Sequence, residues 1–231
     1  MTSKYINISI VVPTYNEEKV LERTLTSLNM DAGDELIVVD GGSSDGTLDI
    51  ARKFTGNVIS SKKGRGSQLR AGAQNANCEA ILILHADSML PDNALEQIRH
   101  ALGSGLSGYG AFDLRIDHSA FCFRVTELFA NIRSWITKIP YGDQGMFFLR
   151  SLYLDVGGFA DIPLMEDIDI SRRLKKTGRP VFLRPPVHAS PRRWLEEGIV
   201  YTTLRDWKLA LMFAILNVSP ETLIKSYKDV R

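Results

Sequence analysis

The sequence predicts an α/β fold in which a mostly parallel central sheet is flanked by helices. Short apolar runs alternate with stretches of helical periodicity, and brief polar turns separate them. The run at residues 81–84 consists of four branched apolar side chains, which is typical of a strand buried on both faces. A chain of 231 residues with 44% hydrophobic residues suits one such domain followed by a helical C-terminal extension.

The amino-terminal part shows this alternation most clearly. We expect strands at residues 7–12, 35–40 and 57–60, each followed by a turn that leads into a helix. The turn at residues 41–47 is rich in glycine and serine, as a tight strand-to-helix connection requires. No Gly-x-Gly-x-x-Gly pattern follows the first strand, which argues against a dinucleotide-binding Rossmann domain.

The second part of the chain continues with a helix over residues 91–102 and a strand that ends near residue 114. Apolar residues then recur at three- and four-residue spacings, which predicts an amphipathic helix packed on the sheet through Phe121, Val125, Phe129, Ile132 and Ile136. A helix beginning at residue 166 and a short strand at 181–183 follow. The apolar run at residues 209–216 is far shorter than the ~20 residues of a spanning helix, so we expect the C-terminal helices to dock rather than cross a membrane.

Two side chains that can bind a metal follow the buried run at residues 81–84. His85 and Asp87 alternate around Ala86, so an extended backbone places both on one face. Ligands of open α/β sheets bind beyond the carboxyl ends of the strands, and a carboxylate is a common ligand of Mg²⁺ or Mn²⁺ beside phosphates. The alternative is that Asp87 and Ser88 only cap the helix that follows.

A basic, glycine-rich loop precedes the helix that follows residues 57–60. It spans residues 62–72 and contains Arg65 and Arg70, either of which could bind a diphosphate together with free backbone N–H groups. A solvated basic loop explains the same composition.

Several segments, taken together and in this order, resemble the glycosyltransferase family 2 enzymes of the GT-A fold, a Rossmann-like nucleotide-diphospho-sugar transferase fold. The resemblance covers residues 8–195 and rests on Val-Val-Pro-Thr-Tyr-Asn-Glu at 11–17, Val-Val-Asp-Gly-Gly-Ser-Ser-Asp-Gly-Thr at 38–47, His-Ala-Asp at 85–87 and Glu-Asp-Ile-Asp at 166–169. His85 stands where the family has the first Asp of Asp-x-Asp, which leaves Asp87 as the matching residue.

The resemblance implies a nucleotide-binding half made by the first strands. We expect Asp40 to accept the ring N–H of a uracil, and Glu17 or backbone groups near Pro13 to contact the ribose. Asp40 and Ser43 could instead only stabilise their turn. The expected nucleotide-binding residues are Pro13, Thr14, Tyr15, Glu17, Asp40, Ser43, Arg65, Arg70, His85, Ala86 and Asp87. The expected ligands of Mg²⁺ or Mn²⁺ are Asp87 and His85, with His188 as a further candidate.

The same resemblance assigns the acceptor side to the second half of the domain. Asp167 is the expected general base, with Glu166 as the alternative, although acidic residues at a helix start are also ordinary dipole partners. Asp143 and Gln144 are acceptor-side candidates. Arg193 and Trp194 match the end of a Gln-x-x-Arg-Trp motif of processive relatives, but Ser190 replaces its glutamine, so processive polymerisation is not supported.

These features predict an inverting glycosyltransferase, hexosyltransferase-like, that moves a sugar from a nucleotide diphosphate, UDP above others, to an unknown acceptor. The His-Ala-Asp and Ser-x-Arg-Arg-Trp variants resemble a subgroup labelled for arsenosugar-type biosynthesis. A sugar-1-phosphate nucleotidylyltransferase and a catalytically inert nucleotide-sugar binding module are the alternatives.

Composition and domain organisation complete the expectations. A net charge of +1 argues against a nucleic-acid partner. The two cysteines lack the spacing of a zinc site or disulfide framework, and no apolar signal region precedes the first strand, so we expect a cytoplasmic protein, free or peripheral at the inner membrane face. The expected units are a GT-A domain over residues 1–195, divided near 115, and a helical extension over 196–231 that contacts a membrane or forms a homodimer.

Overall fold

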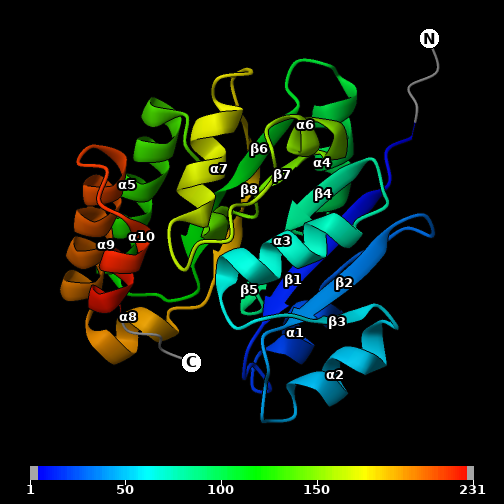
Figure 1. Ribbon diagram of the computed structural model, residues 1–231, viewed down its shortest axis with the longest axis horizontal. Helices are drawn as coiled ribbons and strands as arrows, with labels where there is room; N and C mark the ends of the chain where they lie inside the picture. Colours follow the sequence, from blue (N-terminus) through cyan, green and yellow to red (C-terminus); the bar gives the residue numbers. More distant parts are fainter. Residues whose placement is uncertain (1–4, 228–231) are drawn as a thin grey trace.

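An eight-stranded mixed sheet forms the centre of the computed structural model, which describes residues 5–227. Helices cover both faces of this sheet (Figure 1). The strands are β1 (Ile8–Thr14), β2 (Glu35–Asp40), β3 (Val58–Ser60), β4 (Ala80–Ile83), β5 (Ser88–Met89), β6 (Tyr109–Ile116), β7 (Phe147–Leu149) and β8 (Val181–Ala189). Their order in the sheet is β3-β2-β1-β4-β7-β6-β8-β5.

The first four strands of that order are parallel, so their carboxyl ends meet at one edge of the sheet. β1 lies between β2 and β4, with Val11 opposite both Ile37 and Ile83. β7 then runs antiparallel between β4 and β6, and β6 pairs in parallel with β8. The predicted α/β class with its flanking helices is confirmed.

Helices are distributed between the two faces as expected for a doubly wound sheet. The helices are α1 (Leu21–Thr26), α2 (Thr47–Phe54), α3 (Arg65–Asn75), α4 (Ala94–Gly103), α5 (Phe121–Thr137), α6 (Arg150–Asp155), α7 (Glu166–Leu174), α8 (Arg192–Glu197), α9 (Ile199–Ala214) and α10 (Pro220–Leu223), with 3₁₀ turns η1 (Gly142–Gln144) and η2 (Ile224–Ser226). Apolar residues of α1, α2 and α4 pack on one face, and those of α3, α6 and α7 pack on the other.

β8 is longer than the three-residue strand expected at 181–183. It pairs with β6 from Gly110 opposite Val181 to Ile116 opposite Ala189, and the register shifts between Phe112 and Leu114. The irregularity accommodates Pro185 and Pro186, which cannot donate backbone hydrogen bonds.

The apolar stripe expected to pack α5 on the sheet lies instead on its exposed side. Phe121 and Ile136 are 78% and 75% exposed, and Phe129 is half exposed. The opposite, partly polar side faces β6, where Glu127 accepts a hydrogen bond from the backbone N–H of Ile116 and Asn131 bonds both backbone groups of Leu114. The prediction was wrong because these backbone groups of β6 need polar partners, which periodicity alone does not reveal.

The C-terminal helices dock on the domain. Leu209 and Ala210 of α9, with Leu223 of α10, form a buried cluster with Met165 and Ile168 at the start of α7. Among residues 5–227, no helix combines the length and hydropathy needed to cross a bilayer.

Substituting Gly110 with alanine should destabilise the sheet between β6 and β8. A Cβ at Gly110 would lie 2.3 Å from the backbone oxygen of Val181, which cannot move without breaking the strand pairing. Overpacking of this kind costs about 1–3 kcal/mol, measurable by urea unfolding. Gly56→Ala, where a Cβ meets nothing within 4 Å, is the matched control. Equal stability of the two variants would contradict this expectation.

Candidate active site

The carboxyl ends of β1 and β4 border a cavity of about 580 Å³ that extends to the C-terminal helices. The cavity is lined by side chains from both halves of the domain and from α8, α9 and η2. Ten residues expected from the sequence line it: Pro13, Glu17, Arg65, His85, Ala86, Asp87, Asp143, Asp167, Arg193 and Trp194. The structure therefore places the expected metal ligands His85 and Asp87 and the expected base Asp167 in one cavity.

Eight expected site residues do not line this cavity: Thr14, Tyr15, Asp40, Ser43, Arg70, Gln144, Glu166 and His188. Arg70 is exposed on α3, whereas Arg65 faces the cavity. Arg70 follows Arg65 by five positions in α3, so the two side chains leave the helix in directions about 140° apart. Tyr15 lies under the ammonium group of Lys63, 3.9 Å from the ring centroid, and Lys63 itself lines the cavity.

Asp40 is engaged by its own turn. Its Oδ2 accepts hydrogen bonds from the backbone N–H groups of Gly42 and Ser43 at 2.8 and 2.9 Å, and its Oδ1 accepts one from the Ser43 hydroxyl. The side chain is 2% exposed. These contacts support the alternative that Asp40 and Ser43 hold the turn, and recognition of uracil by Asp40 stays a prediction.

Beside the expected metal ligand Asp87, Arg192 bridges two carboxylates. Arg192 Nη2 lies 3.0 Å from Glu17 Oε2 and 3.3 Å from Asp87 Oδ2. Burial acts to lower the pKa of Arg192, but the charges of Glu17 and Asp87 outweigh it and raise the pKa. The guanidinium group therefore stays charged and neutralises both carboxylates.

The residues present fit a divalent cation only together with a bound diphosphate. Asp87 offers a carboxylate and His85 an imidazole within the same cavity. Among residues 5–227, no group of three or more His, Cys, Asp or Glu side chains is arranged to hold a metal. Mg²⁺ commonly takes one or two carboxylates and completes its shell with phosphate oxygens and water. A cation at Asp87 would also have to compete with Arg192.

His188 lies away from His85. It is opposite Met89 in the pairing of β8 with β5, and it lines a separate cavity of about 70 Å³ that Asp87 also borders. The structure thus brings Asp87 near each histidine but does not join all three.

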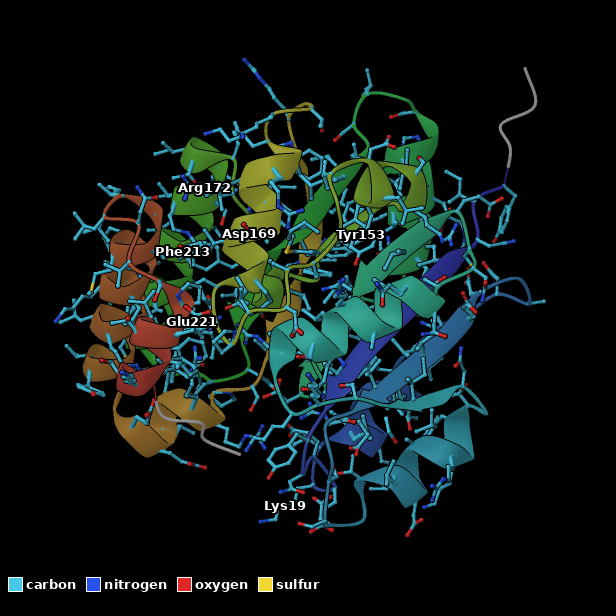
Figure 2. The ribbon with its side chains drawn as sticks, viewed as in Figure 1. Lys19, Tyr153, Asp169, Arg172, Phe213 and Glu221 are labelled. Atoms are coloured by element: carbon cyan, nitrogen blue, oxygen red, sulfur yellow. The ribbon has the colours of Figure 1, made fainter. Side chains whose placement is uncertain are left out.

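Asp167 lies at the start of α7, the helix that carries Asp169 and Arg172 in Figure 2. Its Oδ2 accepts a hydrogen bond from the backbone N–H of Gly142 at 2.8 Å. A Cβ placed on Gly142 would be 3.1 Å from His85 Nε2 and 3.4 Å from Asp167 Oδ2. The expected base, Asp167, and the expected metal ligand His85 therefore approach each other across Gly142, which has no side chain.

Glu166 does not line the cavity and pairs with Arg65, which does. The Arg65 Nε lies 2.5 Å from Glu166 Oε1, and the Glu166 side chain is 1% exposed. Burial acts to lower the pKa of Arg65, but the neighbouring carboxylates of Glu166 and Asp167 outweigh this effect and raise it. Of the two adjacent acidic residues, only Asp167 lines the cavity.

Asp143 lies among several charges in the same cavity. Burial raises the pKa of its carboxyl group, and nearby Asp167 adds to the increase, while Arg133 acts against it. The Arg133 guanidinium carbon lies 3.1 Å from the ring centroid of Tyr141, which also lines the cavity. A carboxyl group with a raised pKa therefore lines the same cavity as the expected base, Asp167.

Gln144 has a structural position. Its amide is fully buried, accepts hydrogen bonds from the Ser134 hydroxyl and the Tyr141 N–H, and donates to the backbone oxygen of Phe112. These bonds join α5, η1 and β6. Acceptor contact by Gln144 stays a prediction that its burial does not favour.

Arg193 and Trp194 belong to the wall between the cavity and the C-terminal helices. Arg193 pairs with Asp206 at 2.8 Å and donates a hydrogen bond to the Tyr227 hydroxyl. Trp194 is 8% exposed and packs edge-on against Phe123. Its burial leaves little of the ring to stack on a sugar.

Comparison with known proteins decides the family. The model of the family described as "Glycosyl transferase family 2" matches residues 9–157, more than half of the chain. The chain belongs to this family. It resembles undecaprenyl-phosphate 4-deoxy-4-formamido-L-arabinose transferase of Aeromonas hydrophila, with 27% identity over 151 residues, or 60% of this chain and 46% of that protein. The chain spans less than half the length of the relatives it matches.

Solved structures share the GT-A fold of this family 2 enzyme. The Staphylococcus aureus TarS 1–349 complex with UDP-GlcNAc superposes with a TM-score of 0.65 at 17% identity and covers 94% of this chain and 69% of that one. The mannosyltransferase PcManGT of Pyrobaculum calidifontis, in complex with GDP-Man and Mn²⁺, gives 0.67 at 18% identity, covering 99% and 67%.

Sequence reasoning missed several residues that line the cavity of this family 2 chain, namely Lys63, Arg133, Tyr141, Arg192 and Tyr227. Arg192 was adjacent to the motif residue Arg193, and no local signal distinguishes which of two neighbouring arginines faces Asp87. Arg133 lay inside a helix whose pattern was interpreted as apolar.

Substituting Asp143 with asparagine should change how stability depends on pH. A carboxyl group whose folded-state pKa is raised stabilises the protein fully below its unfolded pKa, about 4, and this contribution is lost as pH rises through the folded pKa. Asp143→Asn should therefore gain stability relative to the parent between pH 4 and 7, measured by urea unfolding at each pH.

The opposite sign is expected for Asp45→Asn. Burial opposes the effect, but hydrogen bonds from Thr47 and Glu18 lower the pKa of Asp45. That variant should lose stability relative to the parent as pH rises through the same range. Parallel pH profiles for Asp143→Asn and the parent would contradict the assignment of a raised pKa.

Proposed function

We propose that this family 2 glycosyltransferase transfers a sugar from a nucleotide diphosphate, UDP above others, to an acceptor hydroxyl or phosphate with inversion at the anomeric carbon. The observation that carries the proposal is the position of Asp167 in the same cavity as His85 and Asp87. Family membership supports a nucleotide-sugar donor. The UDP-GlcNAc complex of TarS supports UDP, while the GDP-Man complex of PcManGT supports testing guanine nucleotides as well.

On the donor side, the diphosphate is expected near the edge formed by His85, Asp87 and Arg192. Asp87, with His85, would hold Mg²⁺ or Mn²⁺, which supplies charge neutralisation for the departing diphosphate when bound. Lys63 and Arg192 add fixed positive charge at the same cavity wall. Recognition of the base and ribose by Pro13, Thr14, Tyr15 and Glu17 is part of this proposal.

On the acceptor side, Asp167 is the proposed general base. It takes the proton of the acceptor as the acceptor oxygen forms a bond to the anomeric carbon, and the bond from that carbon to the diphosphate oxygen breaks with its electron pair. The Gly142 N–H holds the Asp167 carboxylate in place. Inversion follows because attack and departure occur on opposite faces of the sugar.

Finer assignments also remain proposals. They include the subgroup labelled for arsenosugar-type biosynthesis, the division of the chain near residues 115 and 195, a cytoplasmic or membrane-peripheral location, and contact of the C-terminal helices with a membrane or a second copy. The relatives' undecaprenyl-phosphate acceptors support testing lipid phosphates as acceptors.

A panel of nucleotide sugars with Mg²⁺ or Mn²⁺, read by thermal shift and donor hydrolysis together, tests the function. A donor at about a hundred times its Kd adds about 2.7 kcal/mol to the free energy of unfolding, so UDP sugars should raise Tm and be hydrolysed slowly to UDP. Release of pyrophosphate would indicate a nucleotidylyltransferase, and binding without turnover an inert module. Failure of every nucleotide sugar to raise Tm would overturn the proposal.

Replacing Asp167 with asparagine should lower transfer by about 10²–10⁴ because general-base catalysis is lost. UDP affinity and Tm should stay near the parental values. Glu166→Gln is the matched comparison: it breaks a largely buried ion pair that positions the start of α7, should cost up to about 3 kcal/mol of stability, and should lower the rate of the folded fraction far less than Asp167→Asn does. A near-parental kcat in Asp167→Asn with collapse in Glu166→Gln would move the role to Glu166.

Replacing Asp87 with alanine should abolish the dependence of UDP affinity on Mn²⁺, as measured by calorimetry with and without the cation. His85→Ala should weaken that dependence, since an imidazole ligand is lost. His188→Ala is the control, because His188 borders a different cavity. An unchanged Mn²⁺ effect in Asp87→Ala would show that the cation is bound elsewhere.

A further inference from the structure

The outer surface of α5 and α9 is unusually apolar. Of the seventeen large apolar side chains that residues 5–227 expose, twelve lie on these helices or directly after α9. We call this surface the α5–α9 face; it consists of Phe121, Val125, Leu128, Phe129, Ile136, Val200, Tyr201, Leu204, Trp207, Leu211, Ile215 and Leu216. The two helices stand side by side at the left of Figure 1 and meet where Phe129 and Trp207 contact, with ring centroids 5.8 Å apart.

The face reverses the usual polarity of surface helices. Surface helices normally turn charged and polar residues to solvent. Among the exposed residues of α5 and α9, both fully described, Lys208 alone carries a charge. The side chains of α9 project away from the domain at the left of Figure 2. Contiguous apolar patches of this kind mark surfaces that contact a protein or a membrane.

The active-site cavity reaches this face from the inside. Thr126 and Ala130 of α5 line it, as do Thr203, Trp207 and Ala210 of α9. Trp207 is therefore shared by the cavity wall and the α5–α9 face, and it is 42% exposed. The same two helices also give the cavity the charged side chains of Arg133 and Asp206, so its wall there joins apolar and charged groups beneath an apolar outer surface.

We propose that the α5–α9 face docks on a lipid monolayer and that the acceptor is a membrane amphiphile, whose polar head reaches Asp167 while its chain lies between α5 and α9. This proposal rests on the proposed glycosyltransferase function and names the acceptor class of the same site. It accounts for a single cavity whose lining includes both the charged Asp167 and Trp207, a side chain that is also exposed on the α5–α9 face.

A lipid surface fits these features better than a second copy of the chain. The aromatic rings of Tyr201 and Trp207 suit the boundary between headgroups and acyl chains, and Lys208 attracts anionic lipid. A second copy that covered Trp207 would bury the side chain that links the cavity to the outer surface, and would leave an acceptor no approach from that side. Arg133 and Arg193, which line the cavity, offer cations to an anionic head.

Vesicle binding tests the docking surface. The full chain should co-sediment with vesicles of phosphatidylglycerol and phosphatidylcholine. The double variant Leu204→Gln/Leu211→Gln should bind them at least about tenfold more weakly, because the free energy of burying two leucine side chains in the lipid is lost. Leu106→Gln/Leu154→Gln is the matched control. Leu106 and Leu154 are exposed at 91% and 52%, compared with 58% and 56% for Leu204 and Leu211, and lie after α4 and on α6, away from the face (Figure 1).

Tryptophan fluorescence locates the contact. Vesicles of brominated phosphatidylcholine should quench the emission of the parent, and Trp207→Phe should lose most of this quenching, since Trp194 is buried and Trp135 is partly buried. Equal quenching in Trp207→Phe, or equal vesicle binding by the two double-glutamine variants, would overturn the proposal.

Two further outcomes separate this proposal from its alternatives. A parent that forms a dimer in sedimentation, becomes monomeric in Leu204→Gln/Leu211→Gln and ignores vesicles would make the face a homodimer interface and refute lipid docking. UDP affinity measured on the same samples distinguishes a failure of the lipid-acceptor proposal from a failure of the proposed glycosyltransferase function. Lost vesicle binding with intact UDP binding rejects only the acceptor class, whereas vesicle binding without any nucleotide binding rejects the proposed function.

Discussion

The buried ion pair between Arg65 and Glu166 is the constraint on which the site depends. Arg65 begins α3 and Glu166 begins α7, so the pair joins two helices whose starts are 101 residues apart. The backbone is close there too, because a Cβ on Gly66 would lie 2.4 Å from the Ile162 oxygen. Breaking such a pair leaves an uncompensated buried charge. The pair therefore fixes the start of α7 against the start of α3, next to Asp167, which lines the cavity.

A second set of polar contacts holds the opposite wall. Gln144 joins α5, η1 and β6 through its buried amide, and this places Gly142 where its N–H reaches Asp167. Because Gly142 has no side chain, His85 and Asp167 approach each other across it. Buried polar groups must be fully paired, so these networks specify one arrangement of the wall rather than several. The position of Asp167 thus depends on buried polar contacts behind the wall of the cavity.

The C-terminal helices complete the cavity and also carry its surface contact. Their inner side chains pack on the start of α7, while their outer side chains form the α5–α9 face. One helix, α9, thereby lines the cavity with Thr203 and Ala210 and exposes Leu204 and Leu211. Its inner side also carries the buried Thr202 and Arg205, so α9 is mainly apolar on its outer side alone.

The sequence by itself determined the strands that meet at the nucleotide edge, because buried parallel strands and glycine-rich turns have strong local signatures. The resemblance of its motifs to the family singled out His85, Asp87 and Asp167, which line one cavity in the structure, while their roles stay predictions. Tertiary structure decided what the local pattern cannot encode. Arg192 rather than Arg193 contacts Asp87, and the buried amide of Gln144 joins α5, η1 and β6. The apolar stripe of α5 faces outward. Each depends on partners far away in the chain, and a side chain's direction is set by those partners rather than by its neighbours in sequence.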